Sequence, residues 1–245
     1  MELHPAAPDD DLVHVRYRLT DALDAGVVQR ALALLSPDEL ERHERFRADR
    51  DRREFAVAHG LLRATLSEFG DVAPTDWRFA AGAHGKPALA QGVSALPLSF
   101  SLSHARGLVA CLVARDADVG VDVELVARTR DWRSIASRYF AAEDRAQIDR
   151  APEADQAARF FELWTLKEAF AKAVGLGLPQ ALGAVFEVAD GRVSARTLPH
   201  GADPAAWHFA LYTPAPGHRL AVAVSDGSVR RWRVDVKAAA AAERE

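Results

Sequence analysis

The feature that most constrains this chain is a repeated order of predicted elements. Residues 12–19 alternate apolar and polar side chains as a strand does, and residues 119–125 alternate in the same way. Each strand is followed by helical segments, the last of them a long helix that a glycine ends. The two glycines, Gly70 and Gly175, lie 105 residues apart. The chain therefore looks like one supersecondary pattern used twice.

The rest of the chain follows the same order. Predicted helices cover residues 21–35, 52–69, 132–140 and 157–174, and predicted strands cover residues 98–102, 108–114, 207–212, 220–225 and 231–236. We predict an α+β fold of two similar α/β halves, residues 1–117 and 118–245. A ligand is expected in the cleft between them, because pockets favour domain interfaces. Chance likeness between two common α/β patterns is the alternative.

Composition and charge narrow the function. The chain has 245 residues, 49% of them hydrophobic, and a net charge of -4, which disfavours general nucleic-acid binding. Its single cysteine, Cys111, allows no intrachain disulfide and suits the reducing cytoplasm. No apolar run approaches the roughly 20 residues of a membrane span, and residues 1–11 lack the pattern of a signal peptide. We expect a monomeric cytoplasmic protein.

The predicted strand at residues 119–125 carries two carboxylates. Because successive side chains of a strand face opposite sides, Asp122 and Glu124 share one face, roughly 6–7 Å apart, while the intervening valines face the core. Two carboxylates at that spacing can converge on a hard cation such as Mg²⁺. An exposed acidic strand face is the alternative.

The predicted helix at residues 157–174 carries a second polar row. Trp164, Glu168 and Lys172 recur every four residues, with Lys167 beside them. The apolar stripe on the opposite face comprises Leu163, Leu166, Phe170 and Val174. A tryptophan on the polar face indicates a contact beyond the helix. The alternative is a surface Glu168–Lys172 pair with Trp164 covering a loop.

Two further segments suit a phosphate group. Ser103 and His104 end a predicted strand, and Lys86 precedes it; together they supply neutral and cationic donors. A catalytic serine is disfavoured because the Gly-x-Ser-x-Gly turn is absent. The arginine-rich segment 45–63 could clamp a phosphate with one or two of its guanidinium groups. The alternatives are a capped loop histidine and a solvated helix face.

Taken in order, these motifs resemble the 4'-phosphopantetheinyl transferases of the larger, surfactin-synthetase-activating type. The resemblance covers roughly residues 45–175. It rests on Gly85-Lys86-Pro87, Phe100-x-x-Ser103-His104, Gly120-Val121-Asp122-Val123-Glu124 and Trp164-Thr165-x-Lys167-Glu168-Ala169-x-x-Lys172-x-x-Gly175, with 45–63 as the family's arginine-rich block. One departure is Ser101, where the family often has asparagine. The resemblance implies two similar α/β halves with the active site between them.

The resemblance also implies a reaction. The family moves the phosphopantetheine arm of coenzyme A onto a serine of an apo acyl or peptidyl carrier protein and releases 3',5'-ADP. Asp122, Glu124 and Glu168 would hold Mg²⁺ against the pyrophosphate. The C-terminal half would therefore carry the metal and pyrophosphate site, and the N-terminal half the nucleotide contacts.

The remaining residues receive roles by the same resemblance. Lys172 and Lys167 would add positive charge at the pyrophosphate, and Glu168, or secondarily Glu143, would assist the loss of the serine proton. The contacts at the 3'-phosphate end of the nucleotide would come from Arg53, Lys86, Ser103 and His104.

Two rival functions are a metal-dependent phosphodiesterase and a non-catalytic module that binds coenzyme A or a carrier protein. The usual nuclease pattern needs a lysine two residues after its carboxylate on a strand, and here that position is Val126. A pure binder need not keep a full metal site.

Overall fold

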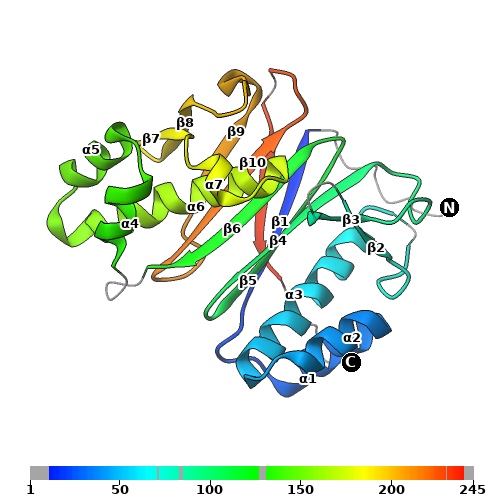
Figure 1. Ribbon diagram of the computed structural model, residues 1–245. Helices are drawn as coiled ribbons and strands as arrows, with labels where there is room; N and C mark the ends of the chain where they lie inside the picture. Colours follow the sequence, from blue (N-terminus) through cyan, green and yellow to red (C-terminus); the bar gives the residue numbers. More distant parts are fainter. Residues whose placement is uncertain (1–10, 71, 83–84, 127–130, 230, 240–245) are drawn as a thin grey trace. The chain divides into compact units, whose positions relative to one another are not determined.

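The structure is a computed structural model that describes residues 11–70, 72–82, 85–126, 131–229 and 231–239 (Figure 1). The chain divides into two compact units. The first comprises the residues up to Asp116 together with those from Trp232 onward, and the second comprises Ala117–Arg231. Within the described residues, no helix is both long and apolar enough to cross a membrane.

The first unit is built on a four-stranded sheet in the order β11-β1-β5-β4. Strands β1 (Leu12–Leu19), β5 (Leu108–Arg115) and β4 (Leu98–Ala105) pair antiparallel, whereas β11 (Arg233–Ala238) pairs parallel with β1. A small hairpin of β2 (Phe79–Ala81) and β3 (Pro87–Leu89) accompanies the sheet. Strand β5 is apolar throughout its first seven residues and is buried along that length.

Among the described residues, the α-helices of this unit are α1 (Ala25–Leu34), α2 (Pro37–Arg45) and α3 (Asp49–Ser67). Helix α2 begins with a capping box, in which Ser36 and Glu39 satisfy each other's backbone donors. Helix α3 packs on β4 and β5, and α1 packs against α3 (Figure 1). The core between α3 and the sheet includes Val57, Leu61, Leu62, Leu66, Trp77, Phe100, Val109, Cys111 and Val113.

The last strand corrects the predicted division of the chain. The prediction placed residues 118–245 together, but β11 belongs to the first unit because it pairs with β1, with Val13 opposite Val234 and Val15 opposite Val236. The first boundary falls after Asp116, one residue before the predicted one. Pairing between the two ends of a chain leaves no mark on local alternation, so the pattern located the strand without its partner.

The second unit repeats the architecture. Its sheet has the order β6-β10-β9, with β6 (Asp118–Leu125), β10 (His218–Ser225) and β9 (His208–Tyr212) antiparallel, beside a hairpin of β7 (Val185–Ala189) and β8 (Arg192–Thr197). The helices are α4 (Trp132–Tyr139), α5 (Ala142–Arg150), α6 (Gln156–Val174) and the short α7 (Leu178–Ala181). Both units run strand, two short helices, one 19-residue helix, hairpin and two further strands, which confirms the predicted duplication.

Helix α6 is the centre of the second unit. It packs on β6 and β10 and also contacts α4, α5 and α7. The closest approach is at Gly120, where a Cβ atom would lie 1.9 Å from the carbonyl oxygen of Ala169, so a side chain cannot fit. Gly175 ends the helix at φ 69°, as predicted. The prediction of a single buried stripe is too narrow, because Thr165, Lys167, Ala169, Ala171 and Ala173 are buried as well.

Candidate functional site

The first candidate site lies where β6 meets α6 in the second unit. Gly120, Asp122 and Glu124 share the face of β6 that is turned toward the helix. The Nζ atom of Lys172 lies 2.8 Å from Oδ1 of Asp122. The indole Nε1 of Trp164 donates to Oε1 of Glu124 at 3.1 Å. The predicted strand row and the predicted helix row therefore face each other.

Glu168 lies on α6 between these two contacts, one turn after Trp164 and one turn before Lys172. Its side chain is half-buried, as is that of Glu124. The row therefore combines three carboxylates, one ammonium group and one indole on two packed elements. The sequence pattern identified all five.

Burial rules out the alternative of an exposed acidic strand face. Asp122 is only 5% exposed, and a carboxylate that leaves water needs a compensating charge, which Lys172 provides. The ring of Trp164 stacks on Phe160 of the same helix at 5.8 Å and on Phe140, which follows α4, at 6.3 Å. Those contacts fix the indole that hydrogen-bonds Glu124.

The donor set suits a divalent cation by its chemistry. Carboxylate oxygens are the ligands that Mg²⁺ prefers, and three of them project from β6 and α6. Within the described part of the chain, however, no three His, Cys, Asp or Glu side chains are gathered closely enough to hold a metal. Lys172 instead balances Asp122, and Trp164 engages Glu124. These residues are of the types that bind Mg²⁺. In this structure the ammonium group of Lys172 is paired with one of the carboxylates, that of Asp122.

Lys167 is not in this row, which corrects its predicted position beside the pyrophosphate. Its side chain is fully buried, and Nζ lies 2.8 Å from Oδ2 of Asp144 on α5. Nζ also donates to the carbonyl oxygens of Leu182 and Ala184. Burial lowers the pKa of the Lys167 ammonium, and Asp144 opposes that shift. One residue along a helix is a rotation of about 100°, so Lys167 points away from β6.

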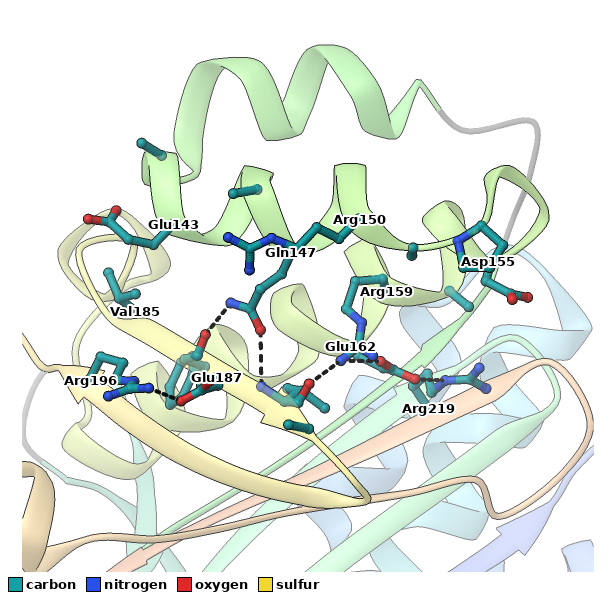
Figure 2. A pocket seen from close by; sticks show the side chains of 18 residues that line it. Glu143, Gln147, Arg150, Asp155, Arg159, Glu162, Val185, Glu187, Arg196 and Arg219 are labelled. Carbon is teal, nitrogen blue, oxygen red and sulfur yellow. Dashed lines mark hydrogen bonds and ion pairs between the residues drawn. The ribbon is translucent and has the colours of Figure 1, made fainter.

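Glu143 also lies apart from the row. It is exposed in the first turn of α5 and lines a cavity of about 1140 Å³ formed by α5, α6 and β7. Figure 2 shows Glu143 at one end of this cavity, away from the pair of Glu162 and Arg219. Asp122, Glu124 and Glu168 do not line it. The structure thus groups Glu168, but not Glu143, with the carboxylates of β6.

In the same cavity, side chains cover the edge of β7 that does not pair with β8. The amide of Gln147 accepts from the backbone nitrogen of Val188 at 3.0 Å and donates to the carbonyl oxygen of Phe186 at 2.5 Å. Arg159 donates to the carbonyl oxygen of Val188 at 3.0 Å. Side chains therefore satisfy the backbone groups that a further strand would otherwise use (Figure 2).

The second candidate site lies in the first unit, in a cavity of about 440 Å³. The end of β4 contributes Ser103 and His104, and the helical side contributes Arg42, Arg50 and Phe55. Ser103 is buried, whereas His104 is exposed. The structure therefore brings the predicted Ser-His pair against the arginine-rich segment.

Aromatic and charged groups shape the wall of this cavity. The rings of Phe55 and His59 stack at 4.1 Å, and the guanidinium group of Arg42 lies 5.4 Å from the Phe55 ring. Nδ1 of His59 lies 2.7 Å from Oε1 of Glu39. Burial would raise the pKa of Glu39, but hydrogen bonds from His59, Ser36 and Arg63 lower it to about 2. Glu39 is therefore ionised, and its contact with His59 holds that lining residue in place.

Two predicted nucleotide contacts do not line this cavity. Arg53 is half-buried on α3, and Lys86 is half-buried just before β3. Arg50, which lies in the predicted arginine-rich segment 45–63, does line it, as do Arg42 and Arg106, which the motifs did not single out. For α3 a signal was available, because Asp51, Glu54, Phe55, Ala58 and His59 recur at helical spacing and face the cavity together.

Comparison with known proteins places the chain in a family. The family model described as "4'-phosphopantetheinyl transferase superfamily" matches residues 118–224, and the model described as "4'-phosphopantetheinyl transferase, N-terminal" matches residues 25–116. These two spans lie one in each compact unit. The 4'-phosphopantetheinyl transferase ffp of Bacillus subtilis is 30% identical over 79% of this chain and 83% of its own length. The chain belongs to the 4'-phosphopantetheinyl transferase family, and the resemblance read from its motifs is confirmed.

Two other proteins are similar over smaller shares. The 4'-phosphopantetheinyl transferase HetI of Nostoc sp. is 35% identical over 62% of this chain and 64% of its own length, so the match spans slightly less than two thirds of that relative. The crystal structure of Thermotoga maritima holo-[acyl-carrier-protein] synthase matches with a TM-score of 0.36 and 21% identity, covering 47% of this chain and 64% of that chain.

Proposed function

We propose that this chain transfers the 4'-phosphopantetheine arm of coenzyme A to a serine hydroxyl of an apo acyl or peptidyl carrier protein. The serine oxygen attacks the β-phosphorus, the bond to the nucleotide phosphate breaks, and 3',5'-ADP leaves. Family membership supports this reaction. The observation that carries the proposal is the row of Asp122, Glu124, Glu168 and Lys172 across β6 and α6.

Asp122, Glu124 and Glu168 would hold Mg²⁺, and a bound Mg²⁺ would neutralise charge on the pyrophosphate. Phosphoryl transfer depends on positioning and charge neutralisation more than on covalent help from the protein. The donor types meet that requirement. Transfer should therefore stop in EDTA and return with excess Mg²⁺; full activity in EDTA would contradict the assignment of these carboxylates.

Lys172 would supply a positive charge to the pyrophosphate oxygens. It is a third exposed and pairs with Asp122, so its ammonium group can reach either a carboxylate or an incoming anion. Glu168 would accept the proton of the attacking serine, because it lies in the same row. Glu143 is the second candidate for this proton, although it lines the separate cavity beside α5.

Ser103 and His104 would bind the 3'-phosphate of coenzyme A. The cavity that they line also presents the guanidinium groups of Arg42, Arg50 and Arg106, which suit an anionic group. Arg53 and Lys86 would act from outside this cavity, by long-range charge. We further propose that the protein is cytoplasmic, because coenzyme A and carrier proteins share that compartment. We also propose that it is a monomer.

The decisive test mixes the purified chain with Mg²⁺, coenzyme A and a panel of apo-carrier proteins. Mass spectrometry should find phosphopantetheine on the carrier serine, and a carrier with that serine changed to alanine should stay unmodified. As a matched control, Arg192→Gln changes an exposed arginine of β8 in the second unit and should leave transfer intact. A folded chain that modifies no carrier would favour a binding module, whereas hydrolysis of coenzyme A without a carrier would favour the phosphodiesterase.

A further inference from the structure

The cavity of Ser103 and His104 contains a second histidine, His59, to which the family motifs assign no role. His59 lies on α3, and its ring lines this cavity beside Phe55. The side chain is 17% exposed, so it is mostly shielded from solvent and still accessible. The rings of His59 and Phe55 stack at 4.1 Å, which restricts rotation of the imidazole. A titratable group is therefore held at the wall of the proposed phosphate site.

One ring nitrogen of His59 is engaged by α2. Its Nδ1 lies 2.7 Å from Oε1 of Glu39. The other oxygen of Glu39, Oε2, accepts from Arg63 at 2.7 and 3.0 Å and from the backbone nitrogen of Ser36 at 2.8 Å. Burial would raise the pKa of Glu39, but hydrogen bonds from His59, Ser36 and Arg63 lower it to about 2, so the ionised carboxylate can only accept. Nδ1 of His59 therefore carries a proton in this contact.

The other ring nitrogen, Nε2, is available to a ligand. Within the part of the chain that the structure describes, the only polar side-chain contact of His59 is the one with Glu39. Because Nδ1 carries a proton, Nε2 accepts in the neutral ring and donates in the imidazolium ion. An anion beside an imidazole favours the charged form. An anionic group in the cavity would thus meet a cationic donor.

The other charged groups of the cavity leave Nε2 free for such a ligand. The described titratable side chains that line it besides His59 are Arg42, Arg50, Asp51, Glu54, His104 and Arg106. Arg50 pairs with Asp51 at 3.1 Å. Glu54 accepts from the hydroxyl of Thr20 at 3.4 Å and from the backbone nitrogen of Gly107 at 3.2 Å. Among these described carboxylates and Glu39, only Glu39 is bonded to His59, and Arg63 already balances its charge.

We propose that His59 is a further binding residue for the nucleotide, whose protonated ring donates from Nε2 to the 3'-phosphate that Ser103 and His104 bind. The inference rests on the proposed function, because it takes the 3'-phosphate of coenzyme A to lie in this cavity. Glu39 is the positioning residue, since its contact with Nδ1 fixes which nitrogen is left for the ligand. Nucleotide binding near neutral pH is then accompanied by uptake of a proton at Nε2, and no covalent bond to a heavier atom changes.

Calorimetry of 3',5'-ADP with the full chain tests this proton uptake. Titrations in buffers of different ionisation enthalpy give the number of protons that accompany binding. The unchanged chain should take up more protons than the His59→Gln variant, whose amide can donate from the place of Nε2 but cannot titrate. The ligand's own phosphates titrate in both experiments, so they cancel in the difference. Equal proton uptake by the two proteins would overturn the proposal.

Affinity tests the contact itself. His59→Ala should weaken 3',5'-ADP at least about tenfold, since a hydrogen bond between two charged groups is lost. His59→Gln should recover part of that affinity, because a neutral donor remains. The effects of His59→Ala and His104→Ala should not add, because both residues act on one phosphate. Adenosine 5'-monophosphate lacks the 3'-phosphate, so its affinity should be the same for all these proteins; an equal loss for this ligand would overturn the assignment.

The nitrogen NMR signal of the His59 ring gives a readout that needs no stable variant. On addition of 3',5'-ADP, Nε2 should move to the chemical shift of a protonated nitrogen, while Nδ1 stays protonated through Glu39. An Nε2 signal that does not change when the ligand saturates the chain would overturn the proposal.

Controls separate this inference from the proposed function. His43→Gln changes a histidine of α2 that does not line the cavity, and it should leave affinity and proton uptake unchanged. Thermal unfolding of His59→Gln should match that of the unchanged chain, because Arg63 still balances Glu39. If the unchanged chain binds neither 3',5'-ADP nor coenzyme A, the proposed function fails and the inference fails with it. If it binds both and modifies carriers, while His59→Gln keeps full affinity and proton uptake, the inference alone fails.

Discussion

Helices α3 and α6 occupy equivalent places in the two units, and each carries one fully buried cation. In α3, Arg63 donates to Glu39 of α2 at 2.7 Å. In α6, Lys167 pairs with Asp144 of α5 at 2.8 Å. Both pairs tie the long helix to the short helix before it, and Glu39 and Asp144 lie 105 residues apart, the offset of the duplication.

The helices differ in what else they carry. Helix α6 also carries Lys172, which is a third exposed and pairs with Asp122 on β6. Helix α3 presents Phe55, His59 and the exposed Arg50 to a cavity. The comparison teaches that a buried ion pair can be part of the scaffold, and that the partly exposed pair beside it is the better candidate for chemistry. Lys167 belongs to the first kind.

The largest expected effect comes from changing Lys167, which the comparison assigns to the scaffold. Lys167→Met should cost about 3–5 kcal/mol of unfolding free energy, because it leaves Asp144 buried without its partner. Lys172→Met should cost far less stability, since that side chain is partly exposed, yet it should reduce transfer. Urea unfolding measures the first effect and carrier modification the second. A stable, inactive Lys167→Met protein would restore Lys167 to the active site.

The pair in α3 can be tested by pH. The pKa of Glu39 is about 2 in the folded chain, against an ordinary value of 4.5, so its stabilising effect is full above about pH 4.5. That effect should be lost as pH falls toward 2, by up to about 3 kcal/mol. Unfolding free energies at several pH values should show the decline, and Glu39→Gln should flatten this part of the profile. Parallel profiles for the two proteins would contradict the assigned ion pair.

Asp122 tests whether the partly exposed pair serves chemistry. Asp122→Asn keeps the shape and removes the charge, and it should lower turnover at least about 10²-fold, the scale of a lost transition-state contact. Stability should fall only modestly, because Lys172 can turn toward solvent. Steady-state carrier modification measures this effect, with Arg192→Gln as control. Turnover within a few-fold of the unchanged chain would make this pair structural too.

The smallest expected effect concerns the cavity beside α3. If His104 binds the 3'-phosphate, His104→Ala should raise the KM for coenzyme A with little change in kcat, because that phosphate does not react. The loss should be roughly 1.5–3 kcal/mol, typical of a bond to a charged group. The control ligand is 3'-dephospho-coenzyme A, which the variant should barely distinguish from coenzyme A. Unchanged discrimination would place the 3'-phosphate elsewhere.

Sequence patterns located the row on β6 and α6 because two local periods suffice for it. Alternation puts Asp122 and Glu124 on one face of a strand, and four-residue spacing puts Trp164, Glu168 and Lys172 along a helix. Once the two elements pack, the rows meet. No longer-range information is needed.

The same local periods could not predict which residues or strands from distant parts of the chain come into contact. Whether Lys167 reaches solvent or Asp144 depends on where α5 packs, and that is a tertiary contact. The pairing of β11 with β1 joins the two ends of the described chain, so alternation could not reveal it. Arg42 and Arg106 reach their cavity from separate elements, and only the fold brings them together.

Gly120 has a consequence for how this protein can change over time. The three atoms nearest to a Cβ atom built there are all backbone atoms of Ala169 and Ala173, so no side chain can be trimmed to make room. Even a single methyl group would wedge α6 away from β6 and draw Lys172 off Asp122 while leaving every ionisable residue in place. At position 120 a change to alanine should therefore be enough to separate Lys172 from Asp122, although every ionisable residue is unchanged.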